Sequence, residues 1–381
     1  MKQVAESVKS LFKDHFHGSP EYLVRAPGRV NLIGEHTDYN MGYVLPVAID
    51  RNIWVAFRPR SDDEIHLYSL DFNESIHIAD LDSLGKSGNW SDYILGTVWE
   101  LNRQGFPSRG WEGIIAGDIP IGAGLSSSAA TEIAIALACT LASGFSWDPV
   151  SMAILGQKVE RDWLGVRSGI MDQMVVANAT QGYALLLDCR SLAMQHIPLP
   201  GDVSMAVLDT KTRRGLINSP YTSRVEECSL AAEFLGLPTL RNLDEKYLEV
   251  HKGALNETLY RRCRHVVTEN RRVHQAVDAL QTSQLVKLGR ILQEGHDSLR
   301  DDFEVSGRFQ DYIVEIANKA PGCLGARMTG AGFGGCAIAL VRRASEQEFK
   351  SYVFDEFTRL SGISPEIIFC TSSAGASREM I

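Results

Sequence analysis

The segment Gly117-Asp-Ile-Pro-Ile-Gly-Ala-Gly-Leu-Ser-Ser-Ser-Ala-Ala130 joins a short apolar strand, 114–116, to an alanine-rich helix expected over 127–142. Its glycines let backbone amides approach an anion closely, and the start of the helix offers free N–H groups and a favourable dipole for phosphate. The hydroxyls of Ser126 to Ser128 add donors or magnesium ligands. A serine-capped helix after a turn is the simpler alternative. Because the glycines and serines exceed what a cap requires, we predict a phosphate-binding loop.

A second polar segment lies upstream, at Arg25-Ala-Pro-Gly-Arg-Val-Asn-Leu-Ile-Gly-Glu-His-Thr-Asp-Tyr-Asn40. It gathers Arg29, Glu35, His36 and Asp38 in a stretch rich in turn formers. Carboxylates accept hydrogen bonds from vicinal hydroxyls, and an imidazole either donates or accepts. Such a cluster suits a polyol substrate. On these residues alone, a surface loop of solvated charges remains the alternative.

A third segment, Thr329-Gly-Ala-Gly-Phe-Gly-Gly335, matches the pattern GxGxxG but is followed by an apolar strand. A dinucleotide-binding site of the Rossmann type needs a strand before the glycines and a helix after them, so that interpretation fails. A tight turn into a sheet is the plain alternative. The tripeptide Gly85-Lys-Ser87 lacks the leading glycine of a P-loop, because residue 80 is Asp80. A nucleotide must therefore be bound differently.

Composition excludes several classes of protein. The chain has 381 residues, more than one hydrophobic core usually supports, and its net charge of −9 argues against non-specific nucleic-acid binding. Seven scattered cysteines without a CxxC pair indicate reduced thiols in a cytoplasmic protein. The longest apolar stretch, 133–142, is too short to span a bilayer, and residues 1–16 lack the core of a signal peptide. We expect a soluble protein with neither nucleic acid nor membrane as partner.

Strands and helices alternate irregularly along the chain, which favours an α+β fold over a doubly wound sheet. Helical patterns cover 3–16 and most of 221–300, and strand patterns recur in both halves. The turn Pro198-Leu-Pro-Gly-Asp202 is the most plausible boundary. The sequence therefore predicts two domains, 1–200 and 201–381.

In this order and at these distances, the three segments resemble the three motifs of the GHMP kinases. The stretch Gly28-Arg-Val-Asn-Leu-Ile-Gly-Glu-His-Thr-Asp-Tyr39 is similar to the galactokinase signature in particular. Further stretches also resemble galactokinases: Gly169–Gln173, Arg262–Val273 and Ser298–Ser306. The resemblance runs from about residue 10 to the end.

The resemblance implies a ribosomal-S5-like α+β domain followed by a ferredoxin-like α+β domain, with the active site in the cleft between them. It also implies ATP and Mg²⁺. The matching nucleotide-binding residues are Trp90, Tyr93, Gly122, Ala123, Gly124, Leu125, Ser126, Ser127 and Ser128. A serine of this loop, Ser127 or Ser128, and the later Glu160 would hold magnesium. Sugar recognition would fall to Glu35, His36, Asp38, Gly169, Asp172 and Tyr221.

The resemblance assigns the chemistry to Asp172 and Arg29. Asp172 would either take the proton from the sugar hydroxyl as a general base or orient that hydroxyl. A neighbouring arginine weakens a carboxylate as a base, and phosphoryl transfer is loose enough that the attacking oxygen needs little activation. Orientation is therefore favoured. Arg29, with magnesium, would stabilise charge on the γ-phosphate oxygens.

The function implied is ATP-dependent phosphorylation of the anomeric hydroxyl of galactose by a monomeric enzyme. Two alternatives stay open. One is a kinase for a related hexose such as N-acetylgalactosamine. The other is a non-catalytic sugar and ATP sensor; because such sensors lack part of the serine and alanine run that is complete in Gly124-Leu-Ser-Ser-Ser-Ala-Ala130, the enzyme is favoured.

Overall fold

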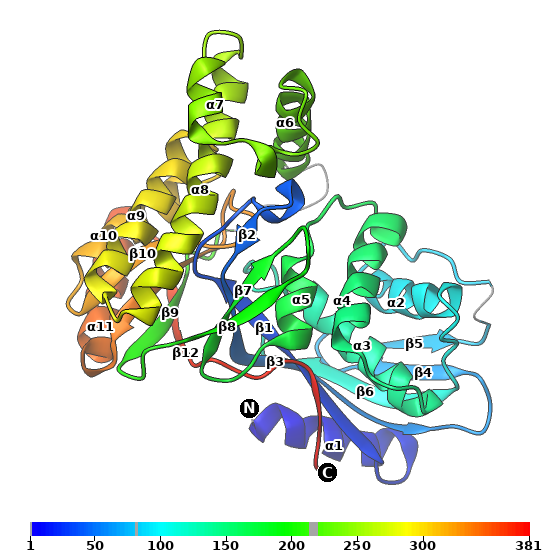
Figure 1. Cartoon of the computed structure of the whole chain (residues 1–381). Helices are drawn as coiled ribbons and strands as arrows, with labels where there is room; N and C mark the ends of the chain where they lie inside the picture. Colours follow the sequence, from blue (N-terminus) through cyan, green and yellow to red (C-terminus); the bar gives the residue numbers. More distant parts are fainter. Residues whose placement is uncertain (1, 81–82, 213–219) are drawn as a thin grey trace.

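The computed structural model describes residues 2–80, 83–212 and 220–381 (Figure 1). A six-stranded sheet forms the base of the N-terminal half, with the strand order β13-β1-β3-β6-β4-β5. Its strands are β1 (Tyr22–Asn31), β3 (Pro46–Pro59), β4 (Ile65–Ser69), β5 (Glu74–Ile78), β6 (Trp111–Gly117) and β13 (Ser377–Glu379). Neighbours pair antiparallel except β4 and β6, which are parallel. A smaller sheet contains β2 (Tyr43–Val44), β7 (Tyr183–Asp188) and β8 (Met194–Pro198).

Helices cover both faces of the large sheet. The amphipathic α1 (Lys2–Phe16) places Val8 and Phe12 against Trp54 of β3. On the opposite face lies α3 (Ser127–Ser143), which is apolar on nearly all sides and therefore buried in the largest core cluster. Around α3 pack α2 (Asp92–Arg103), α4 (Pro149–Lys158) and α5 (Met171–Asn178) (Figure 1).

The segment that carries Glu160 begins as an α-helix and ends in a π turn. Asp148 caps α4 by accepting a hydrogen bond from the Val150 amide, with Pro149 in the first turn. After Lys158 the chain widens into a π turn, Val159–Leu164, which ends at Gly165 with a φ of 77°. Such turns are rare and occur frequently at functional sites. This one carries Glu160.

The C-terminal half is built on a four-stranded antiparallel sheet with the order β10-β11-β9-β12. Its strands are β9 (Val203–Asp209), β10 (Cys323–Met328), β11 (Cys336–Arg342) and β12 (Glu366–Cys370). Helices separate β9 from β10 and β11 from β12, which gives the βαββαβ pattern of a ferredoxin-like unit. These helices are α6 (Pro220–Phe234), α7 (Glu245–Val250), α8 (Glu257–Gln281), α9 (Leu285–Asp301), α10 (Arg308–Lys319) and α11 (Glu346–Ser361).

The predicted two-domain α+β fold is confirmed. The predicted boundary near residue 200 falls between β8 and β9, but the last strand, β13, returns to pair with β1 in the first sheet. The division into 1–200 and 201–381 therefore stays a prediction. All seven cysteines lie in the described ranges, and none of them forms a disulfide. Among the helices of the described ranges, none combines the length and the apolar character needed to cross a membrane.

Candidate active site

The three motif segments meet around one cavity of about 780 Å³. Every residue predicted for catalysis, sugar, nucleotide or metal lines it except Ala123, whose side chain is buried beneath the loop. The cavity also reaches the third segment, 329–335. The Thr329 side chain joins the second and third segments, because its hydroxyl accepts from the Asn31 amide at 3.0 Å and donates to the Asn31 carbonyl oxygen at 3.2 Å.

Arg29 reaches the phosphate loop because β1 bends toward it. The pairing of β1 with β3 shifts register between Pro27 and Arg29, and a bulge of this kind re-aims a side chain. Gly28 permits the approach, since a Cβ there would lie 2.9 Å from the Leu125 carbonyl oxygen. The amide of Arg29 donates to that same oxygen at 3.0 Å. The sugar motif and the phosphate loop are thus joined through backbone contacts.

Asp172 lies in the first turn of α5 and is held from two sides. Arg29 donates from Nε to Oδ1 at 2.7 Å and from Nη2 to Oδ2 at 2.6 Å, which is a bidentate ion pair. The hydroxyl of Ser126, from the phosphate loop, also donates to Oδ2. The remaining end of the guanidinium, Nη1, donates to the Gly124 carbonyl oxygen at 2.6 Å. The carboxylate is therefore fixed in orientation at the point where the loop begins its helix.

His36 is buried and neutral in the wall of the cavity. Its backbone has a φ of 61°, in the left-handed region that few non-glycine residues adopt. Burial lowers the pKa of His36 to about 3. Nε2 lies 3.1 Å from the Ala331 carbonyl oxygen, which only accepts, so the proton is on Nε2. Nδ1 then accepts from the Tyr39 hydroxyl at 2.9 Å.

Glu35 is tied to the C-terminal domain by a buried group of charges. Its Oε2 lies 2.6 Å from Nη2 of Arg327, and that same nitrogen lies 3.0 Å from Oε1 of Glu269. All three side chains are almost fully buried. Burial raises the pKa of Glu35 to about 7 against the opposing effect of Arg327, whereas Arg327 and Arg272 hold the pKa of Glu269 well below its usual range despite its burial. Glu35 thus lines the cavity, and its carboxylate is held by the buried pair with Arg327.

Asp38 and Gly169 both line the cavity and are in direct contact with each other. Burial, followed by the charge of Asp172, raises the pKa of Asp38 to about 6. A Cβ on Gly169 would lie 2.6 Å from the Asp38 Cβ and closer still to its carboxylate. Position 169 therefore requires a glycine if Asp38 is to keep its place.

Substituting Gly169 with alanine is expected to raise the KM for the sugar by roughly tenfold or more, a loss of about 1.4 kcal/mol of binding per factor of ten. The added methyl displaces Asp38, whereas the nucleotide loop is untouched, so the KM for ATP stays unchanged. Steady-state kinetics over both substrates measure this. Gly201→Ala is the matched control, because a Cβ at Gly201 meets open space. An unchanged sugar KM in Gly169→Ala would contradict the placement of Asp38.

An aromatic pair, Trp90 and Phe72, lines the part of the cavity where the resemblance predicts the nucleotide. Trp90 stacks on Phe72 with ring centroids 4.3 Å apart and an interplanar angle of 9°, and its Nε1 donates to Glu74 at 2.6 Å. Tyr93 and Asp71 complete this wall. Phe72 and Asp71, which lie between β4 and β5, are not among the residues predicted from the sequence. No motif marks them, and only the fold brings that turn to the cavity.

Two carboxylates, the buried Glu132 and the half-buried Glu160, lie beside the start of α3. Burial raises the pKa of Glu160 to about 7, and it raises the pKa of Glu132 well above the usual range, with the charge of Glu160 adding to the effect. Gln173 donates to one oxygen of Glu132 at 3.1 Å, while the other oxygen has no hydrogen-bond partner among the described residues. Glu132 is also not among the residues predicted from the sequence. It could have been found as the one acidic residue of an otherwise apolar helix, because a glutamate is rarely buried without a partner.

Known proteins of one family are similar to this chain over nearly its whole length. The model of the galactokinase galactose-binding signature matches residues 10–59, and those of the GHMP kinase N-terminal and C-terminal domains match 92–179 and 276–358. A galactokinase of Roseiflexus sp. (strain RS-1) is 40% identical over 98% of this chain and 97% of its own length. The chain belongs to the galactokinase family.

A second curated galactokinase and two solved structures are also similar to this chain. A galactokinase of Chloroflexus aurantiacus is 38% identical over 97% of this chain and 96% of its own length. The crystal structure of Lactococcus lactis galactokinase complexed with galactose superposes with a TM-score of 0.94 at 34% identity, covering 98% of this chain and 99% of that one. The mevalonate kinase of Methanococcus jannaschii, at 22% identity and a TM-score of 0.66, shares the fold.

Proposed function

We propose that this chain transfers the γ-phosphoryl group of ATP to the anomeric hydroxyl of galactose, giving galactose 1-phosphate. The observation that carries the proposal is the junction at Asp172, where Arg29 of the sugar motif and Ser126 of the phosphate loop hold one carboxylate. A phosphate acceptor and a phosphate donor bound by these two segments would meet there. Membership of the galactokinase family supports galactose as the acceptor.

The hydrogen-bond pattern favours Asp172 as an orienting carboxylate. Oδ2 accepts from both Arg29 and Ser126, whereas Oδ1 accepts one bond from Arg29. A carboxylate oxygen has about two lone-pair sites, so Oδ1 keeps one for the anomeric hydroxyl. In the loose transition state of phosphoryl transfer, that hydroxyl needs alignment first and gives up its proton late. Asp172 accepts the proton as the bond to phosphorus forms.

Arg29 stabilises the charge that develops on the transferred group. Its bonds to Asp172 and Gly124 use three N–H groups. A guanidinium has about five, so two are left for the oxygens of the γ-phosphate. The loop residues Gly122, Gly124, Leu125, Ser126, Ser127 and Ser128 supply the phosphate cradle, with Ala123 buried beneath it, and Trp90 and Tyr93 form the adenine side. Glu35, His36, Asp38, Gly169 and Tyr221 surround the sugar.

The residues beside the helix start fit a magnesium ion. Glu160 and the hydroxyl of Ser128 line the cavity, and hard oxygen donors of this kind suit Mg²⁺. Burial raises the pKa of Glu160 to about 7, which indicates a carboxylate that lacks a compensating cation. Ser128 and Glu160 would hold the ion, which when bound neutralises charge on the ATP phosphates. A monomeric state and a cytoplasmic location stay predictions.

The affinity for the sugar is expected to fall in acid. Burial and the charge of Asp172 raise the pKa of Asp38 to about 6, and the sugar hydroxyls donate to its ionised form. Below about pH 6 a proton must leave before the sugar binds, so the sugar KM rises by up to about tenfold per pH unit, whereas above about pH 7 it is constant. In Asp38→Asn the KM should be high at every pH. If that variant keeps the same rise in acid, a different group is responsible.

A sugar panel tests the proposed activity. ADP release is measured with galactose, N-acetylgalactosamine, glucose and mannose, and the phosphorylated position is determined by NMR. We expect the highest kcat/KM for galactose, with phosphate on the anomeric oxygen. A higher kcat/KM for N-acetylgalactosamine would reassign the acceptor. ATP binding without turnover of any sugar would overturn the catalytic function in favour of a sensor.

A further inference from the structure

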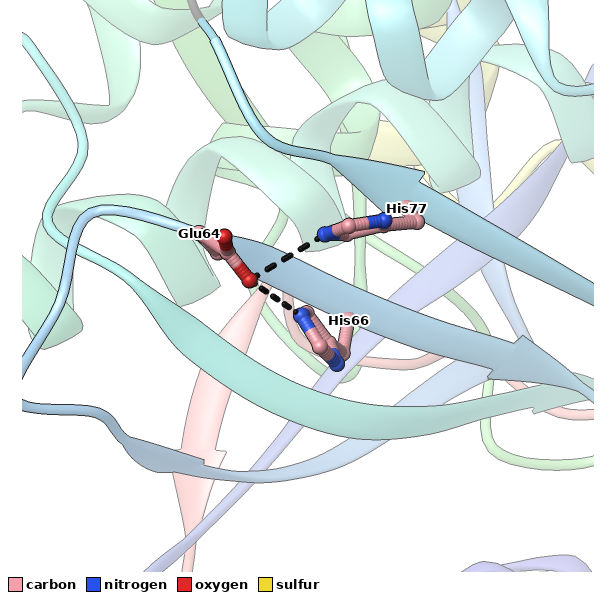
Figure 2. Close-up of side chains that lie close together, drawn as sticks. All are labelled: Glu64, His66 and His77. Carbon is pink, nitrogen blue, oxygen red and sulfur yellow. Dashed lines mark hydrogen bonds and ion pairs between the residues drawn. The ribbon is translucent and has the colours of Figure 1, made fainter.

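The hairpin of β4 and β5 carries three metal-ligating side chains on one face. His66 and His77 are directly opposed across the two strands, and Glu64 immediately precedes β4. The neighbouring Ile65, Leu67, Ile76 and Ile78 are buried in the core, so the histidines lie on the opposite, solvent-accessible face. Figure 2 shows both imidazoles directed at the Glu64 carboxylate. We propose that Glu64, His66 and His77 bind a divalent transition-metal cation of the zinc class.

The distances fit a tetrahedral ion. Nε2 of His66 lies 2.8 Å and Nε2 of His77 lies 3.2 Å from the same oxygen, Oε2 of Glu64, and all three donor atoms lie within 4.8 Å of one another. Zinc bonds to nitrogen and oxygen are about 2.0–2.2 Å long, so two ligands of a tetrahedral ion are about 3.3 Å apart. The two nitrogen–oxygen distances of 2.8 Å and 3.2 Å are already close to this spacing. Two imidazoles and one carboxylate complete three positions, and solvent fills the fourth.

The charges around the cluster allow a cation. Glu64 is partly exposed, and its Oε2 atom lies 2.8 Å and 3.2 Å from the two imidazole nitrogens, so a carboxylate oxygen is available to a cation bound by His66 and His77. Among the described residues, Arg60 is the one arginine or lysine that forms an ion pair with Glu64, with Nη2 3.9 Å from Oε2. It is paired with Asp62 and Glu112, which offset its repulsion of a metal ion.

A bound cation would link β4 to β5, the edge strand of the large sheet. At the other end of the same hairpin, Ser69, Asp71 and Phe72 line the nucleotide end of the cavity. The cluster itself contributes no residue to that cavity. Cation binding would therefore stabilise the hairpin that supports the nucleotide wall, and the proposal does not depend on which sugar is phosphorylated.

Zinc titration of the tag-free full chain, followed by calorimetry, tests the site. We expect His77→Ala and His66→Ala to weaken Zn²⁺ binding by about tenfold or more, because even outer-shell partners of a metal lower its affinity that much when removed. The control His196→Ala, an exposed histidine on β8, should bind as the parent does. Hydrogen exchange separates this site from the carboxylates of the active site, since added zinc should slow exchange at 65–69 and 74–78. Equal affinity in all variants, or protection confined to the active-site loop, would overturn the proposal.

Discussion

Replacing Asp172 with asparagine is expected to lower kcat by about 10²–10³-fold or more, the effect of removing one preorganised electrostatic group from an active site. The substitution keeps the shape of the side chain but removes the charge that Arg29 and Ser126 orient. An amide places an NH2 group at one of the two oxygen positions, so either Oδ1 no longer accepts from the anomeric hydroxyl or Oδ2 no longer accepts from Arg29 and Ser126. In both orientations the bidentate pair with Arg29 is broken, and the neutral amide cannot take the proton of the hydroxyl. Steady-state kinetics with saturating ATP and galactose measure the loss.

The control for this variant is Asp202→Asn. Asp202 is also paired with an arginine, Arg342, at 3.1 Å, but this pair is exposed and neither residue lines the cavity. Its kcat should match that of the parent. Circular dichroism and thermal unfolding verify that both variants fold. A kcat near the parent value in Asp172→Asn would remove this residue from the chemistry.

The largest effect on stability is expected at Arg327. Its side chain is fully buried between the carboxylates of Glu35 and Glu269. In Arg327→Met the two acids lose their shared cation, and breaking a buried ion pair from one side destabilises a protein by about 3–5 kcal/mol. Urea unfolding near pH 8 measures the difference. Arg342→Met, which breaks an exposed pair on the neighbouring strand, should change the free energy of unfolding by about 1 kcal/mol or less.

This loss of stability should depend on pH. Burial raises the folded-state pKa of Glu35 to about 7 even beside Arg327, and without that cation the pKa rises further. A carboxyl with a raised pKa is destabilising when ionised, and taking up a proton relieves it. The gap between parent and variant should therefore shrink from about pH 8 to about pH 5. A gap that stays constant over this range would show that lost packing, rather than unpaired charge, is the cause.

The sequence was sufficient to locate the parts of the site that local chemistry marks. The glycines and serines of 117–130 predict an anion site without any tertiary information, and the strand after Gly335 was enough to exclude a Rossmann site. The resemblance then linked Arg29 to Asp172, which are 143 residues apart in the chain. No spacing rule connects such distant residues.

What the sequence could not show depends on long-range packing. The strand β13, which returns to pair with β1, has only three residues, and their sequence carries no strand pattern. No sequence pattern pairs Arg327 with Glu269, and only the docking of α8 and β10 against the segment of Glu35 brings them together. Phe72 reaches the cavity because β4 and β5 extend the large sheet to that wall. The π turn at Glu160 depends on packing that periodicity does not record.

The most direct test is a crystal structure of the full chain with galactose and a non-hydrolysable ATP analogue bound together. We predict that the sugar's reactive oxygen lies within hydrogen-bond distance of Oδ1 of Asp172, facing the terminal phosphorus, while Arg29 contacts that phosphate. A complex in which the sugar turns this oxygen away from Asp172, or in which the phosphates lie off the 122–128 loop, would contradict the account.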